Sequence, residues 1–367
     1  MFIAQLVNTH LERLDISMKI IKKAGAAIVA AALTLSLCSC NDLSWVAKFD
    51  DETTVPSGFY IYSMAEDYRS AVSNYQLSSS ESLEDQTIEV SDSDQKATDY
   101  LDDQAIKNVK SYVGVYQKFK DMELELTEDE ISSATSSAST TYEEDAEVFE
   151  QNGIAQSSVE EYYLDIARKS KVFQAIYGKD GTNAISDKEL KTYFNENYAS
   201  INFIQQYFYN DDGTAMTDDE KEALIKEYKS IKSKAEKGKI KFTDVCEKYS
   251  DEATSYKGGY TDSISRFDKD DEDGAKILSL KTGKFTLLIT DSAIALIQKA
   301  TLDKDGSLFS ENRDSLLIEY KYQDFINEMI AYGESLENVE FNEAAFKKFS
   351  SSTRDFSELS IDSSYSY

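Results

Sequence analysis

Residues 201–209 have the sequence INFIQQYFY, and this stretch marks a change in the character of the chain. β-Branched and aromatic side chains favour pleated sheet, so the stretch predicts a strand. Its surroundings indicate a small α+β module with the order β-α-α-β-β. The elements expected after the first strand are a helix opened by the capping box Thr217/Glu220, a short helix at Phe242–Tyr249, and strands at Phe285–Ile289 and Ala293–Gln298.

The segments on either side of this module have helical periodicity. Apolar side chains recur every three or four residues in Phe59–Tyr75, in Ala97–Met122 and again after Asp303. Trp45–Phe49 alternates like a short strand, whereas the Ser/Glu/Asp-rich stretch Ser78–Asp94 predicts a loop. Capping boxes are expected to open helices at Thr127/Glu130, Ser157/Glu160 and Ser186/Glu189. The domains predicted in chain order are a signal peptide at 1–39, an N-terminal helical segment at 40–198, the α+β module at 199–302, C-terminal helices at 303–349 and a disordered tail at 350–367.

The charge of the chain restricts its partners. It has 39 Lys and Arg against 68 Asp and Glu, a net charge of −29, so its surface should repel nucleic acid and we expect no nucleic-acid partner. No P-loop, dinucleotide fingerprint, zinc-ligand spacing or EF-hand loop occurs, so no cofactor and no metal site is expected. The acidic run DKDDED at 268–273 lacks the alternating ligands of a calcium loop and predicts a solvated loop.

The N-terminus indicates export. Residues 18–23, MKIIKK, are basic and start at a methionine that is itself a good translation start. The apolar run Ala24–Leu37 is too short for a stable membrane span. The following Leu37-Cys38-Ser39-Cys40 resembles a bacterial lipobox with Cys40 as the lipid-accepting residue; Cys38, or an ordinary secretory signal, is the alternative. We therefore expect lipid anchoring on the extracytoplasmic face of a bacterial cell membrane.

Cleavage before Cys40 would have a chemical consequence. The only histidine, His10, would be removed with the signal peptide. The mature chain could then use neither histidine-dependent catalysis nor histidine-ligated metal. Cys246 would be the only cysteine left besides Cys40, and we expect it to be a core residue.

Short motifs in the module resemble the parvulin family of peptidyl-prolyl isomerases. They are, in chain order, KAEKG at 234–238, FTDVC at 242–246, YSD at 249–251 leading into KGG at 257–259, LKTGK at 280–284 and TDSAIALI at 290–297. The helical flanks resemble the split chaperone domain of PrsA-type lipoprotein foldases and SurA-like proteins. That resemblance implies a C-terminal helix that returns to the N-terminal helices.

The same resemblance implies site residues. Parvulins use two histidines, a loop cysteine or aspartate, and an apolar pocket for the proline ring. In this chain the first histidine position corresponds to Gln206 or Tyr207, the second to Ala295, and the loop carboxylate to Asp251 or Glu252. The pocket positions correspond to the charged Lys269 and Asp273. Gly258 and Gly259 are expected to form a turn with positive φ.

These observations predict a membrane-anchored foldase that binds unfolded or nascent secreted polypeptides and has weak or no isomerase activity. An active isomerase, and a non-foldase binding or envelope-scaffold lipoprotein, are the alternatives. The sequence indicates neither the client proteins nor the oligomeric state. The candidate site residues are Asp251, Glu252 and Gln206 for catalysis, Tyr207, Phe208, Tyr60 and Tyr68 for peptide binding, and Cys40 for lipidation.

Overall fold

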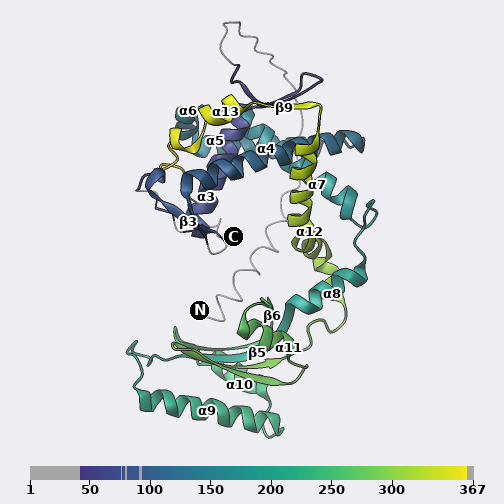
Figure 1. Ribbon diagram of the computed structural model, residues 1–367. Helices are drawn as coiled ribbons and strands as arrows, with labels where there is room; N and C mark the ends of the chain where they lie inside the picture. The colour runs from purple at the N-terminus through teal and green to yellow at the C-terminus, as the bar shows by residue number, and fades with distance from the viewer. Residues whose placement is uncertain (1–41, 76, 79–80, 91–92, 362–367) are drawn as a thin grey trace. The chain divides into compact units, whose positions relative to one another are not determined.

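The computed structural model describes residues 42–75, 77–78, 81–90 and 93–361. The chain divides into two units (Figure 1). One unit spans Ile185–Tyr320, and the other combines the described residues up to Ala184 with those from Lys321 onward. The predicted α+β class, a helical domain interrupted by a small sheet module, is confirmed. None of the helices in the described part of the chain has both the length and the apolar character needed to cross a membrane.

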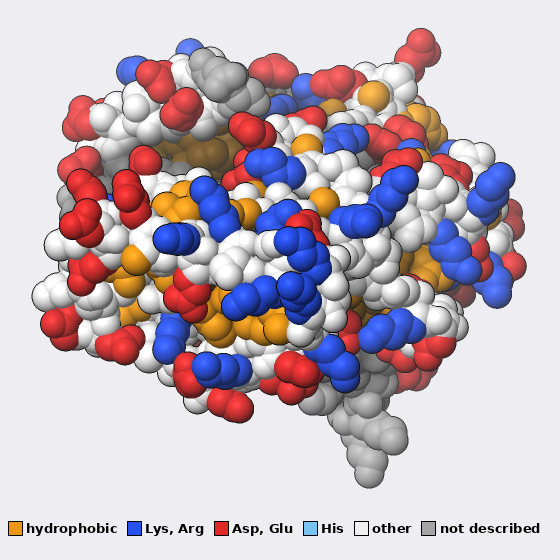
Figure 2. Space-filling view, turned by 90° about the horizontal axis from the view of Figure 1, so that it is seen from below, with side chains coloured by type: hydrophobic (Ala, Val, Ile, Leu, Met, Phe, Trp, Pro, Cys, Tyr) orange, Lys and Arg blue, Asp and Glu red, His pale blue; other side chains and the backbone are white. Residues whose placement is uncertain are grey.

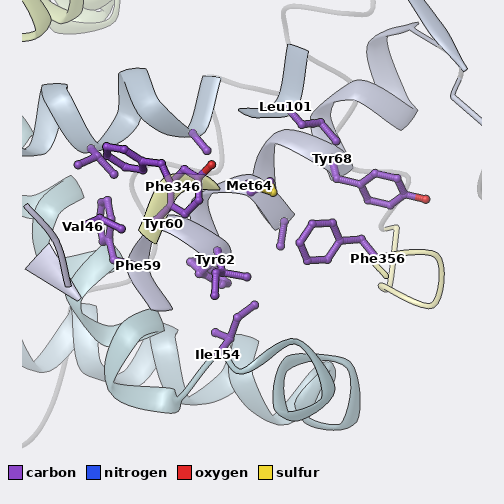
Figure 3. Close-up of a cluster of buried hydrophobic side chains, with 14 of the residues drawn as sticks. Val46, Phe59, Tyr60, Tyr62, Met64, Tyr68, Leu101, Ile154, Phe346 and Phe356 are labelled. Carbon is purple, nitrogen blue, oxygen red and sulfur yellow. The ribbon is translucent and has the colours of Figure 1, made fainter. Parts of the chain in front are cut away.

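The discontinuous unit is mainly helical and is built around α3. Most side chains of α3 are buried, including Phe59, Tyr60, Tyr62 and Met64, because helices pack on several of its sides (Figure 3). The helices of this unit are α3 (Ser57–Tyr75), α4 (Ala97–Asp121), α5 (Glu128–Glu144), α6 (Ala146–Asn152), α7 (Gln156–Tyr177), the part of α12 (Ser307–Ser335) from Lys321 onward, and α13 (Glu343–Lys348).

The two ends of the chain are joined inside this unit. Strand β1 (Trp45–Phe49) pairs antiparallel with β2 (Thr54–Pro56) on one side and with β9 (Val339–Phe341) on the other. Helix α12 also packs closely on α4, because a Cβ added at Gly114 would overlap the carbonyl oxygen of Met329, and one added at Gly333 would overlap that of Lys110. The predicted return of the C-terminal helix to the N-terminal helices is therefore confirmed.

Two segments of this unit differ from the sequence-based expectation. The predicted loop at 78–94 contains a 3-10 turn (Leu83–Asp85) and part of the hairpin of β3 (Thr87–Val90) and β4 (Ser93–Lys96). The expected tail disorder is wrong for 350–361, where Phe356 and Leu359 are buried. Backbone amides of this segment donate to the carboxylates of two aspartates, Ser351 to Asp102 in α4 at 2.6 Å and Ser360 to Asp145 between α5 and α6 at 2.9 Å. Residues 362–367 lie outside the described residues.

Local capping chemistry explains several helix starts. Thr127 and Thr217 both form the complete capping box that their sequences predict. Ser186 caps α8 (Asp187–Asn197) through its hydroxyl, which accepts from the amide of Glu189. The box expected at Ser157 is wrong, because α7 begins at Gln156 and Ser157 already lies inside its first turn.

The continuous unit contains a four-stranded antiparallel sheet with the order β6-β5-β8-β7. Helices α9 and α10 pack on one side of this sheet and α11 on the other (Figure 1). The sequence-based order omitted β6 and α11. The elements after α8 are β5 (Tyr198–Tyr207), α9 (Asp218–Glu236), α10 (Phe242–Asp251), β6 (Lys257–Arg266), α11 (Glu272–Ser279), β7 (Phe285–Ile289), β8 (Ala293–Lys299) and the start of α12.

Replacement of Gly114 by alanine should destabilise the helical unit by about 1–3 kcal/mol. Alanine favours helix over glycine by about 1 kcal/mol, so a loss would arise from the overlap with the Met329 carbonyl rather than from helix propensity. Denaturant unfolding measures the change. Ser137→Ala on the exposed surface of α5 is the control and should stay within about 0.5 kcal/mol. An unchanged or increased stability of Gly114→Ala would contradict the close packing of α4 on α12.

Candidate functional site

The pairing of β5 with β8 decides which side chains share a face of the sheet. Gln205 lies directly opposite Ala295 in this ladder, and neighbouring residues alternate between the two sides. Ala295 belongs to the apolar cluster that also contains Phe203 and Ile297 on the side covered by α11. Ile204 belongs to the cluster under α9 and α10. Gln205 therefore lies on the α11 side, together with Ala295.

The predicted role of Gln206 needs correction. Gln206 follows Gln205 and so lies on the α9–α10 side, away from Ala295. Its partner in β6 is Lys257, whose ammonium is 3.6 Å from a carboxylate oxygen of Glu252. Two groups that act on one peptide bond must face the same space. The positions of β5 that can act together with Ala295 are therefore Gln205 and the predicted alternative Tyr207, not Gln206.

The two predicted carboxylates lie at the C-terminal end of α10. Glu252 is exposed and forms long ion pairs with Lys257 and, at 3.8 Å, with Lys248. Asp251 is also exposed and lines a cavity of about 280 Å³ at the outer edge of β6, together with Cys246, Gly259 and Tyr260. The structure thus brings Glu252 near the Gln206–Lys257 pair on the α9–α10 side, and not onto the face that carries Gln205 and Ala295.

Four tyrosines lie on the same side of the sheet as Gln205. Tyr260 stacks on Phe203 with ring centroids 4.6 Å apart and remains 42% exposed. Tyr209 stacks on Tyr256 at 5.4 Å and remains 40% exposed. The amide of Tyr207 donates to the carbonyl of Tyr256 at 2.7 Å, which continues the β5–β6 pairing. We refer to Tyr207, Tyr209, Tyr256 and Tyr260 as the tyrosine face.

Two glycines of β6 shape this site in different ways. Neither has a positive φ, so the predicted turn is wrong; both lie within the strand. A Cβ added at Gly259 would overlap the carbonyl oxygen of Cys246, so glycine lets β6 approach α10. Gly258 lies opposite Gln205, and a Cβ there would be 3.2 Å from the Tyr260 ring. The absence of a side chain at Gly258 therefore makes room for that ring next to Gln205.

Cys246 has no part in chemistry at this site. It is fully buried among Ile204, Tyr228 and Phe242, so the prediction of a core cysteine is confirmed. Burial raises the pKa of its thiol to about 12, because a thiolate would lose its hydration there. At neutral pH the thiol is therefore protonated and unreactive.

The predicted peptide-binding residues separate into two groups. Tyr60 and Tyr68 are buried in the helical core, where they pack against Phe346 and Phe356, so their prediction as contact residues is wrong (Figure 3). Phe208 is also buried, on the α9–α10 side. Tyr207 is partly exposed and belongs to the tyrosine face.

Two other predictions concern the proline pocket and the lipid anchor. Lys269 is exposed and Asp273 is half-buried, with a carboxylate oxygen 3.3 Å from the ammonium of Lys276, so these charged side chains do not form an apolar pocket. Cys40 lies outside the described residues.

Sequence-based reasoning missed Gln205, Tyr209, Tyr256 and Tyr260. The alternation Tyr-x-Gly-x-Tyr at 256–260 is the signal that could have located two of them, if this stretch had been treated as a strand. For Gln205 the signal was its place in the alternation of a strand. Phe203 and Tyr207 each lie two positions away from it, so the three side chains share one face.

One known family matches part of the chain. Residues 208–298 match the model of the Rotamase family, described as a PPIC-type PPIase domain. The resemblance of the module to parvulins is confirmed for this part of the chain. The match begins after Gln205 and includes β6, α11 and β8.

Solved structures of PrsA proteins are similar to the chain at low identity. The foldase PrsA from Streptococcus pneumoniae str. Canada MDR_19A is 13% identical, with 72% of this chain and 98% of that chain covered and a TM-score of 0.32. The foldase PrsA from Lactococcus lactis is 12% identical, with 83% and 99% covered and a TM-score of 0.33. The peptidylprolyl isomerase PrsA from Bacillus anthracis is 12% identical, with 65% and 99% covered and a TM-score of 0.29. No curated protein matches the chain.

The two glycines of β6 provide a matched test of the site geometry. Gly259→Ala should destabilise the module by about 1–3 kcal/mol, because the backbone of α10 cannot move away easily. Gly258→Ala should cost less, because only the Tyr260 ring must shift. Denaturant unfolding of the two variants gives the comparison. Equal costs, or a larger cost at Gly258, would show that β6 does not contact α10 as described.

The reactivity of Cys246 is the second test of this site. In the chain from Asn41 onward Cys246 is the only cysteine. We expect a thiol reagent at pH 8 to label it slowly in the native protein and rapidly after denaturation, because the buried thiol has a pKa of about 12. Immediate labelling of the native chain would mean that the thiol is accessible and ionised.

Proposed function

We propose that the chain is a membrane-anchored extracytoplasmic foldase that binds unfolded exported polypeptides and has weak or no isomerase activity. The observation that supports this most is the composition of the α11 side of the sheet. Ala295 and Gln205 lie opposite each other there, and both are buried, with exposures of 6% and 7%. Tyr209 and Tyr260 lie on the same side of the sheet and are 40% and 42% exposed. A peptide can therefore contact these rings, whereas the positions that correspond to the two histidines are hardly accessible to it.

The physics of prolyl isomerisation explains why catalysis should be weak. Rotation about a peptide C–N bond has a barrier of roughly 18–20 kcal/mol. A catalyst must bind the twisted bond more tightly than the planar bond. The methyl group of Ala295 makes no polar interaction with a twisted amide, and the Gln205 carboxamide is uncharged. Glu252 lies on the opposite side of the sheet beside Lys257, and Asp251 lines a cavity with Tyr260 at the outer edge of β6, away from the Gln205–Ala295 pair.

The tyrosine face suits a segment of unfolded polypeptide. Tyrosine rings present apolar area and keep a hydroxyl for hydrogen bonding, so they accept many different sequences. Tyr260 and Tyr256 are held by stacking on Phe203 and Tyr209, which lowers the conformational entropy that binding would cost. The substrate class that fits is an extended segment with apolar or prolyl side chains.

An active peptidyl-prolyl isomerase is the second candidate function. The match of residues 208–298 to a PPIC-type PPIase domain favours it. In that case Asp251 or Glu252 would have to reach the substrate from the end of α10.

Two assays on the chain from Asn41 onward distinguish the candidates. A holdase should suppress the aggregation of a denatured client, and an isomerase should accelerate a refolding step limited by proline isomerisation, which takes tens of seconds without a catalyst. We expect clear suppression of aggregation and little or no acceleration of refolding. Acceleration that is lost in Asp251→Ala or Glu252→Ala would establish the isomerase instead.

Tyr260→Ala should weaken the suppression of aggregation, because it removes the most exposed ring of the tyrosine face. Tyr75→Ala is the matched control, since Tyr75 is 39% exposed, packs edge to face against another tyrosine and lies in the helical unit. Equal activity of both variants would count against the tyrosine face as the client site.

Mass spectrometry of the processed N-terminus tests the lipid anchor separately. An unmodified Cys40 would contradict the proposed anchor.

A further inference from the structure

A strongly basic segment stands out in this acidic chain. Residues 225–242 contain seven lysines and two glutamates, with no aspartate and no arginine, although the whole chain has a net charge of −29. The segment comprises most of α9, its C-terminal turn and the start of α10. No part of the proposed client site uses these lysines.

The folding of α9 turns the lysines toward solvent. Leu224 and Tyr228 are buried against the sheet, so the opposite side of the helix is exposed. Lys232 forms an ion pair with Glu236 at 2.6 Å. The other six lysines are exposed and have no ion pair within 4.0 Å among the described residues. These six residues, here called the lysine face, are Lys226, Lys229, Lys234, Lys237, Lys239 and Lys241.

Figure 2 looks at the molecule from the side on which α9 lies in Figure 1. Lys and Arg side chains extend across the middle of this view, with hydrophobic side chains between them. Half-buried Ile225, Ile231 and Ile240 lie within the same basic segment. Cationic and apolar groups are thus interspersed on one exposed surface.

We propose that the lysine face docks onto a membrane surface that contains anionic phospholipid headgroups. This inference rests on the proposed function, because the lipid anchor at Cys40 would hold the chain at such a surface. Each lysine near an anionic membrane strengthens binding by roughly fivefold. An acylated Cys40 would hold the chain at the membrane, and the lysine face would add electrostatic attraction that turns one side of the module toward the headgroups.

Charge and geometry favour a membrane over other anionic partners. At physiological salt, charges interact over about 8 Å, so a flat membrane in contact with the lysine face would sense the lysines and the exposed Glu222 and Glu227 of α9, but scarcely the acidic surfaces farther away. A long flexible polyanion would meet those acidic surfaces as well. The absence of arginine from residues 225–242 also fits headgroup attraction by point charges better than bidentate recognition of single phosphates.

The test uses the unlipidated chain from Asn41 onward and vesicles of phosphatidylglycerol and phosphatidylcholine, with pure phosphatidylcholine vesicles for comparison. Cosedimentation measures binding at low and at high salt. The test variant is Lys226→Gln, Lys229→Gln, Lys234→Gln and Lys237→Gln combined. The control variant carries the same change at four exposed lysines without ion pairs elsewhere in the described structure, namely Lys107, Lys179, Lys188 and Lys269.

We expect salt-sensitive binding to the anionic vesicles only, weakened roughly tenfold or more in the test variant and much less in the control. Equal weakening in both variants, or no binding of the unchanged chain, would overturn the proposal. Binding to polyglutamate without binding to vesicles would assign the face to an acidic polypeptide and also overturn it. The aggregation assay on the test variant tests the foldase proposal separately. The four substitutions lie outside the tyrosine face, so suppression of aggregation should be unchanged.

Discussion

The register of β5 against β8 is the constraint on which the module depends. Because Gln205 lies opposite Ala295, Phe203 and Ile297 face α11, while Ile204 and Leu296 face α9 and α10. A shift of the register by one residue would turn every side chain of the strand to the opposite face, so neither apolar set would meet its own helices. The register of β5 against β6, which sets Phe203 opposite Tyr260, brings Tyr207 and Tyr260 to the same face. The two cores and the candidate client site therefore arise from the two ladders of hydrogen bonds on either side of β5.

Much of the fold could be predicted because its signals are local. The capping boxes at Thr127 and Thr217 depend on residues three apart, and the strands at β5, β7 and β8 have strong β composition. Strand β6 was missed because its paired glycines resemble a turn. Only the tertiary structure shows that Gly259 is needed for the close approach to α10. The ordered segment 350–361 was missed because its few apolar residues, such as Phe356, are buried by helices distant in sequence.

The site was less predictable than the fold for a geometric reason. Adjacent residues of a strand point to opposite faces, so an error of one position moved the prediction from Gln205 to Gln206 and onto the wrong side of the sheet. The aromatic residues Tyr60 and Tyr68 have a helical spacing that suits a core as well as a binding surface. Only packing against Phe346 and Phe356 settles that they belong to the core.

The central claim is that unfolded clients contact the tyrosine face rather than the helices behind the sheet. Site-specific photo-cross-linking tests it most directly. A photoreactive phenylalanine analogue is placed in turn at position 260 and at position 229, which lies on the exposed surface of α9. The account predicts cross-links to a denatured, proline-containing client from position 260 and few from position 229. Cross-links from position 229 alone, or from neither position while the chain still suppresses aggregation, would contradict it.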